Sequence, residues 1–143
     1  MDRRTIAFTI SLILFLCSLF LETFHTDRES QPDAWSNGFA NLLFGVLSGN
    51  VSWLANILII PAWFLLNQKL VLPIFFSLMA SILAFSFYFN GVVIINEAGH
   101  HAEVTEYKIG YWLWSFSMLS YFVFLMIILI SEKRKQKTPD LNR

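Results

Sequence analysis

Four long apolar stretches dominate this chain of 143 residues, and charged side chains stand almost only between and beyond them. A helix rises about 1.5 Å per residue, so it needs roughly 20 apolar residues to cross a hydrocarbon core about 30 Å thick. The stretches approach or exceed that length at residues 6–21, 42–66, 71–90 and 109–130. We therefore predict an all-α fold, an integral membrane four-helix bundle that forms one transmembrane domain.

The composition agrees with a membrane protein. Apolar residues make up 56% of the chain and charged residues only 14%, whereas a soluble domain carries about 25% charged residues. A water-soluble fold of this size cannot hide that much apolar surface, but a bilayer covers it. The lipid bilayer is thus the first predicted partner, and nothing in the sequence points to nucleic acid.

The basic residues predict the orientation. With four spans both termini share one side, which holds Arg3, Arg4, Lys69 and the basic tail 131–143. The outer loops 23–38 and 91–108 are acidic by comparison and contain all three histidines. Because basic residues mark the cytoplasmic side, we predict that both termini are cytoplasmic, in a membrane that we take to be a bacterial inner membrane. The first span is expected to be a retained anchor, because no small-residue cleavage site follows it.

The second span carries small and polar residues along one face. At about 100° per residue, Gly45, Gly49, Ser52, Trp53 and Asn56 fall within one third of its circumference. Small residues let helices approach closely in lipid, so this span is expected to be the central, most contacted helix. In the alternative interpretation the helix breaks near Gly49. Asn50 then caps a shorter span that begins at Val51, with residues 39–47 lying shallow in the outer interface.

Spans three and four carry hydroxyl groups on one face each. We predict that these faces turn inward and form hydrogen bonds between helices, which stabilise the bundle. The hydroxyl residues are Ser77, Ser81 and Tyr88 in span three, and Ser117 and Tyr121 in span four. Tyr88 is also expected to be an aromatic anchor at the outer interface. The alternative is a small-molecule or lipid pocket lined by Asn50, Trp53, Asn56, Tyr88 and Tyr121.

One outer segment has metal-binding chemistry. Glu97, His100 and His101 are close in sequence, and His25 from the first outer loop would complete the set. Imidazole and carboxylate groups together suit zinc or copper. The alternatives are a solvated acidic loop without cofactor, or histidines that sense pH because they titrate near neutrality.

No reaction centre is evident in the sequence. Cys17 is the single cysteine, the histidines all lie outside the predicted spans, and phosphate-binding or nucleophile motifs are absent. The sequence therefore favours a non-enzymatic protein that binds another membrane component, comparable in architecture to accessory, assembly or immunity-type proteins. The first alternative is a metal-dependent accessory or enzyme subunit that uses the outer Glu and His residues. The second is a self-associating pore or carrier whose span-two face lines a shared axis.

Overall fold

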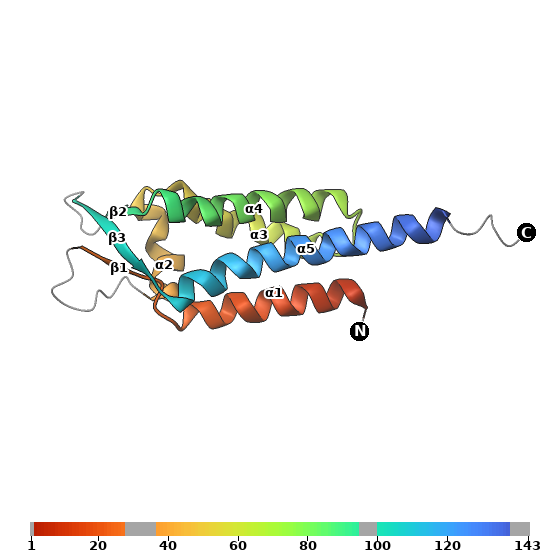
Figure 1. Cartoon of the computed structure of the whole chain (residues 1–143), viewed down its shortest axis with the longest axis horizontal. Helices are drawn as coiled ribbons and strands as arrows, with labels where there is room; N and C mark the ends of the chain where they lie inside the picture. The colour runs from red at the N-terminus through yellow and green to blue at the C-terminus, as the bar shows by residue number, and fades with distance from the viewer. Residues whose placement is uncertain (1, 28–36, 95–99, 138–143) are drawn as a thin grey trace, which may run out of the picture.

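The computed structural model of this protein describes residues 2–27, 37–94 and 100–137. Helix makes up 73% of the structure, so the predominance of helix predicted from the sequence is confirmed. The long helices are α1 (Arg3–Leu19), α3 (Leu54–Phe64), α4 (Val71–Phe89) and α5 (Ile109–Lys137). They form an elongated bundle, in which the start of α1 and the end of α5 lie at the same end (Figure 1). Among the described residues, α4 and α5 are long and apolar enough to cross a membrane.

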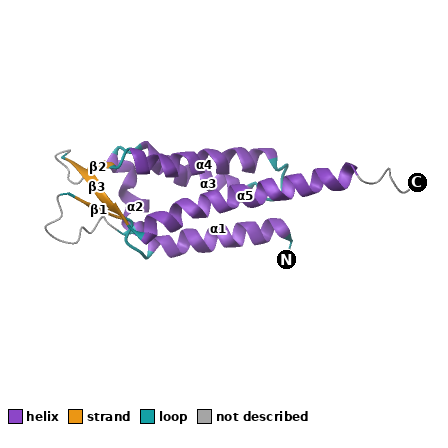
Figure 2. Ribbon diagram, in the orientation of Figure 1, coloured by secondary structure: helices purple, strands orange, loops and turns teal. Residues whose placement is uncertain are grey.

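The outer connections, predicted from the sequence to be loops, form a small β-sheet. Strands β1 (Phe24–Thr26), β2 (Val92–Ile94) and β3 (His101–Tyr107) form an antiparallel sheet in the order β1-β3-β2. This sheet covers the end of the bundle opposite the start of α1 (Figure 2). The prediction of loops throughout 23–38 and 91–108 is therefore wrong for these strands.

The second apolar segment is broken. Helix α2 (Gly38–Phe44) leads into the 3-10 turn η1 (Gly45–Ser48), and a second 3-10 turn, η2 (Val51–Trp53), leads into α3. Gly49 stands at the break with a φ of 67°, a left-handed conformation that glycine adopts without steric cost. Asn50 caps η2, because its Oδ1 accepts from the Ser52 N–H at 3.0 Å. The apolar stretch 42–66 is thus not one continuous helix, and the break near Gly49 with Asn50 as a cap agrees with the alternative interpretation.

Helix α5 occupies the centre of the bundle, not the second apolar segment as predicted. It packs extensively against both α1 and α4, and α3 packs mainly against α4. Its side chains Met118, Tyr121 and Leu125 are fully buried. The physical reason is length: α5 has 29 residues and contacts its neighbours along its course, whereas the break leaves α3 with only 11.

The serine faces do point inward, but their hydroxyl groups bond within their own helices. Ser77, Ser81 and Ser117 are buried. Ser81 Oγ donates to the Ser77 carbonyl at 2.7 Å, and Ser117 Oγ donates to the Trp114 carbonyl at 2.6 Å. A serine side chain is short, and donation to a carbonyl three or four residues back satisfies it locally. The predicted hydrogen-bond links between helices are therefore wrong for these serines, whereas Tyr121 of the same predicted set does form one, to the Ala62 carbonyl.

Aromatic side chains make several of the inter-helix hydrogen bonds instead. Tyr121 Oη donates to the Ala62 carbonyl in the last turn of α3 at 3.0 Å, and Trp63 Nε1 donates to Ser11 Oγ of α1 at 3.1 Å. Ser11 Oγ in turn donates to the Ser117 carbonyl at 2.8 Å. Tyrosine and tryptophan are long enough to reach a neighbouring helix, and buried O–H and N–H groups need such partners.

Candidate functional site: an apolar pocket at the helix break

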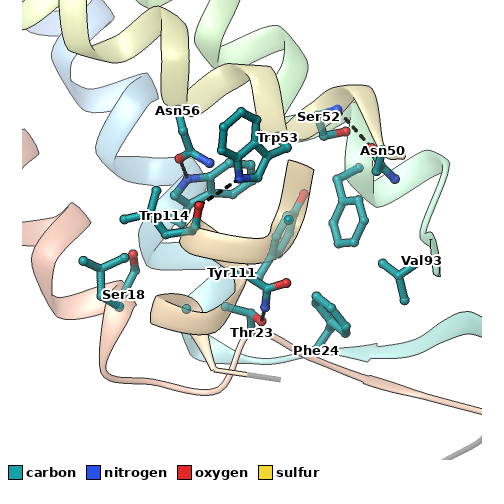
Figure 3. Close-up of a pocket in the computed structure, with 16 residues that line it drawn as sticks. Ser18, Thr23, Phe24, Asn50, Ser52, Trp53, Asn56, Val93, Tyr111 and Trp114 are labelled. Carbon is teal, nitrogen blue, oxygen red and sulfur yellow. Dashed lines mark hydrogen bonds between the residues drawn. The ribbon is translucent and has the colours of Figure 1, made fainter. Parts of the chain in front are cut away.

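A partly enclosed cavity of about 80 Å³ lies where the second apolar segment breaks. Its walls come from the end of α1, from α2, η2 and the start of α3, from the end of α4 and from the start of α5. Strands β1 and β2 contribute Phe24 and Val93 from the sheet side (Figure 3). The break therefore creates the space, and the sheet covers it.

Asn50 fixes the break against the sheet. While its Oδ1 caps η2, its Nδ2 donates to the carbonyls of Asn90 and Val92, each at 3.2 Å. Both carbonyls lie where α4 passes into β2. One amide thus joins the turn before α3 to the end of α4, and this joint holds one side of the pocket in place.

Trp53 forms the next part of the wall. Its Nε1 donates to the Leu42 carbonyl of α2 at 3.1 Å, which satisfies a carbonyl in the last turn of that helix. The indole ring lies against Gly45, where an added Cβ would collide with Trp53 Cδ1. Gly45 therefore provides close packing within this chain, and Gly49 provides the turn. The five residues predicted for one face of span two do not form a face of a single helix, but Gly45, Ser52, Trp53 and Asn56 meet in the wall of this cavity.

Asn56 is a buried part of the wall and is only 6% exposed. Its Oδ1 accepts from Trp114 Nε1 of α5 at 2.8 Å (Figure 3). A buried amide without partners would cost several kcal/mol in an apolar environment, roughly 2–7 depending on the reference. The bond to Trp114 reduces that cost and fixes α3 against α5 beside the cavity.

The remaining polar groups in the lining are also bound to protein atoms. Ser18 Oγ donates to the Phe15 carbonyl, Asn41 Nδ2 donates to Thr23 Oγ1, and Ser52 Oγ is paired with Ser86 Oγ. The described lining contains no carboxylate, histidine, lysine or arginine. The surface offered to an occupant is therefore mainly apolar.

Of the residues predicted to line a pocket, the structure brings Asn50, Trp53 and Asn56 together. Tyr88 does not line it: this side chain is 50% exposed and contacts the rings of Tyr107 and Trp112. Tyr121 is buried lower in the bundle, at its bond to Ala62. Sequence reasoning missed Phe24 and Val93, because both lie on short strands within predicted loops.

The sheet is held onto α4 by Tyr107. Its Oη donates to the Phe87 carbonyl at 2.9 Å, in the last turn of α4. Burial, and more weakly the neighbouring Tyr111 and Tyr88, raises the pKa of Tyr107 to about 12. The phenol therefore stays protonated as a donor, and it fixes the cover of the pocket at any ordinary pH.

The predicted metal residues are only partly described. His25 lies opposite Glu106 in the sheet, and His101 lies opposite Ile94. Five positions along β3 separate these pairs, which corresponds to about 17 Å at 3.4 Å per residue. His25 therefore does not complete a site with His101. His100 is exposed, Glu97 lies outside the described residues, and the described part holds no group of three or more metal-binding side chains.

No protein-family model, no curated protein and no solved structure matches this chain. The class of this protein is therefore defined by its own structure: it is mostly helical, and its described residues contain two helices long and apolar enough to cross a membrane. The apolar pocket at the helix break is the feature on which a function can be argued.

Proposed function

We propose that this chain is a multi-pass membrane protein that acts by binding an apolar membrane component, such as a hydrocarbon chain of a lipid, without catalysing a reaction. The four apolar segments are its crossings, with α2 and α3 together serving as the second. Both termini are cytoplasmic, in a bacterial inner membrane, and the sheet lies on the outer side.

The outside of the bundle supports the membrane location. Large apolar side chains are exposed on every long helix, for example Ile13 of α1, Ile57 of α3, Phe75 of α4 and Ile127 of α5. Water-soluble monomers rarely expose apolar surface of that extent, whereas lipid covers it without cost. The short α3 is compatible with a crossing only together with the chain before the break, because 11 residues span about 16 Å.

The distribution of charge supports the orientation. The start of α1 and the end of α5 lie at one end of the bundle, and the sheet lies at the other (Figure 1). Arg3, Arg4 and the lysines that end α5 therefore share one side, as the rule of positive residues inside requires. The acidic residues Glu22, Glu103 and Glu106 lie at the sheet end.

The pocket carries the functional part of the proposal. It lies where a helix is interrupted, and interrupted helices at membrane depth are tolerated where they line an internal cavity. Its polar atoms are largely bound within the protein, so it fits an apolar occupant better than a sugar, nucleotide or metal ion. Pockets of mainly apolar lining with a few fixed polar groups are typical of small-molecule sites.

The test compares two substitutions on β2. Val93 is buried and lines the pocket, whereas its neighbour Val92 is exposed and does not. Val93→Trp should lower the amount of bound lipid at least roughly fivefold, because the larger side chain occupies the space that the lipid would take. Val92→Trp is the matched control and should retain lipid. Native mass spectrometry of protein released from mild detergent counts the lipids that remain bound, and circular dichroism verifies folding. Equal lipid retention in both variants would contradict the proposal.

The other two functions predicted from the sequence receive no specific support from the described residues. The metal hypothesis depends on Glu97, so it stays a prediction that the metal content of wild type, His100→Ala and His101→Ala would test. The pore hypothesis required a continuous face that contains Gly45 and Gly49. Gly45 instead packs against Trp53 of its own chain.

A further inference from the structure

A second cavity lies at the end of the bundle opposite the sheet. Helix α5 extends past the start of α1 there (Figure 1), and a space of about 240 Å³ lies between the two. Four residues of α5 line it, at spacings that place them on one helix face: Ile128, Ser131, Glu132 and Lys135. Asp2, Arg3 and Arg4 line it from the start of α1.

Three of the charged groups in this cavity already have structural partners. Arg4 donates to the carbonyls of Leu66 and Gln68 at 3.3 and 3.1 Å, and to Glu132 Oε1 at 3.0 Å. Asp2 Oδ1 accepts from the Thr5 N–H at 2.7 Å and caps α1, and this bond lowers the pKa of the Asp2 carboxyl. Arg4 is therefore held between the turn that joins α3 to α4 and helix α5, where its carboxylate partner is Glu132.

Arg3 and Lys135 are the remaining cations of this cavity. Both side chains are exposed, and they come from the two helices that form its walls. With the fixed guanidinium of Arg4, the lining contains three cations and two carboxylates, those of Asp2 and Glu132. Arginine and lysine at short range bind phosphate oxygens through charge-assisted hydrogen bonds.

The surroundings favour a phosphate that is attached to acyl chains. Ile128 forms a buried apolar part of the lining, and Ile6, Ile127 and Ile130 expose apolar surface on the same two helices nearby. In the proposed membrane position this cavity lies at the cytoplasmic headgroup level, because the fourth predicted span ends at residue 130. A phospholipid could therefore place its phosphate in the cavity and its chains along α1 and α5.

We propose that this cavity binds the phosphate group of an anionic phospholipid at the cytoplasmic surface. The proposal rests on the membrane location proposed above, but not on the pocket at the helix break. A free phosphate ester offers the same charge and oxygen atoms, so the test must separate the two sources.

The experiment uses the full chain in nanodiscs of phosphatidylcholine with or without phosphatidylglycerol. The variant Arg3→Gln/Lys135→Gln removes two cations from the cavity. The control Lys69→Gln/Lys133→Gln removes two exposed cations at the same end that do not line it. Phosphatidylglycerol retained on the protein after extraction into detergent is measured by native mass spectrometry, relative to phosphatidylcholine. A third arm adds inorganic phosphate to protein in phosphatidylcholine alone and to protein in the nanodiscs that contain phosphatidylglycerol.

We expect the ratio of retained phosphatidylglycerol to phosphatidylcholine to fall roughly tenfold in the cavity variant. The control should keep most of the wild-type ratio. An equal loss in both would show diffuse attraction to the basic end and overturn the proposal. Inorganic phosphate that binds as tightly as the lipid and displaces it would assign the cavity to a free phosphate ester and overturn the lipid assignment. The Val93→Trp result is independent of these arms, so failure here is distinguishable from failure of the pocket at the break.

Discussion

At the scale of residues, the interior of this protein is organised by long polar aromatic side chains. Trp114 and Tyr121 of α5 reach the neighbouring α3, whereas Ser81 and Ser117 bond to their own backbone. The sequence predicts correctly that the serine faces are inward. It could not predict their partners, because a serine stripe has the same spacing whether its hydroxyls bond within a helix or between helices.

The bond between Asn56 and Trp114 gives a direct test at this scale. Asn56→Leu removes the acceptor and leaves the Trp114 N–H buried without a partner, so we expect the free energy of unfolding to fall by about 1–3 kcal/mol. Unfolding in mixed detergent micelles, followed by circular dichroism, measures this change.

The control is the double variant Asn56→Leu/Trp114→Phe. It removes the donor as well as the acceptor, so it should be more stable than the sum of the two single effects implies. Strict additivity of the two substitutions would mean that this hydrogen bond does not stabilise the bundle.

At the scale of elements, helices were more predictable than connections. The third span was predicted over 71–90 and α4 covers Val71–Phe89, because a long apolar run bounded by polar residues determines a helix locally. The sheet was not predicted because its strands pair across long distances in the sequence: Phe24 lies opposite Tyr107. β1 and β2 have only three residues each, too few to show a reliable alternation of apolar and polar positions.

The break at Gly49 predicts whether Gly49→Ala raises or lowers the free energy of unfolding. In a continuous helix, Gly49→Ala would raise the free energy of unfolding by about 1 kcal/mol, because alanine favours helix. At a φ of 67° the same change should lower it by about 1–2 kcal/mol, since a Cβ is disfavoured in the left-handed region. We therefore expect the free energy of unfolding of Gly49→Ala to be lower than that of the wild type in the same unfolding assay.

Gly49→Asn is the matched control, because asparagine enters the left-handed region more readily than alanine. It should be less destabilising than Gly49→Ala. A stabilised Gly49→Ala variant would instead indicate that the helix is continuous, and the pocket would lose its structural basis.

At the scale of the whole molecule, the proposed arrangement is a bundle with an even number of crossings. Alkaline phosphatase is active only outside the cytoplasm of a bacterial host. We expect a fusion to the first 36 residues to be active and a fusion after Arg143 to be inactive, with a cytoplasmic fluorescent reporter showing the opposite pattern. Activity of the phosphatase after Arg143 would mean either an odd number of crossings or the opposite orientation of the bundle, and both contradict the proposed arrangement.

The sheet also has a consequence for how the molecule is assembled. β1 pairs only with β3 in the described structure, and Phe24 lies opposite Tyr107, so the two partners are more than eighty positions apart in the chain. Because the chain is synthesised from its amino terminus, β1 can pair with β3 only after every helix before α5 has been made. The cavity at the break is therefore among the last parts of the molecule to form, because Phe24 of β1 and the α5 residues Tyr111 and Trp114 all line it.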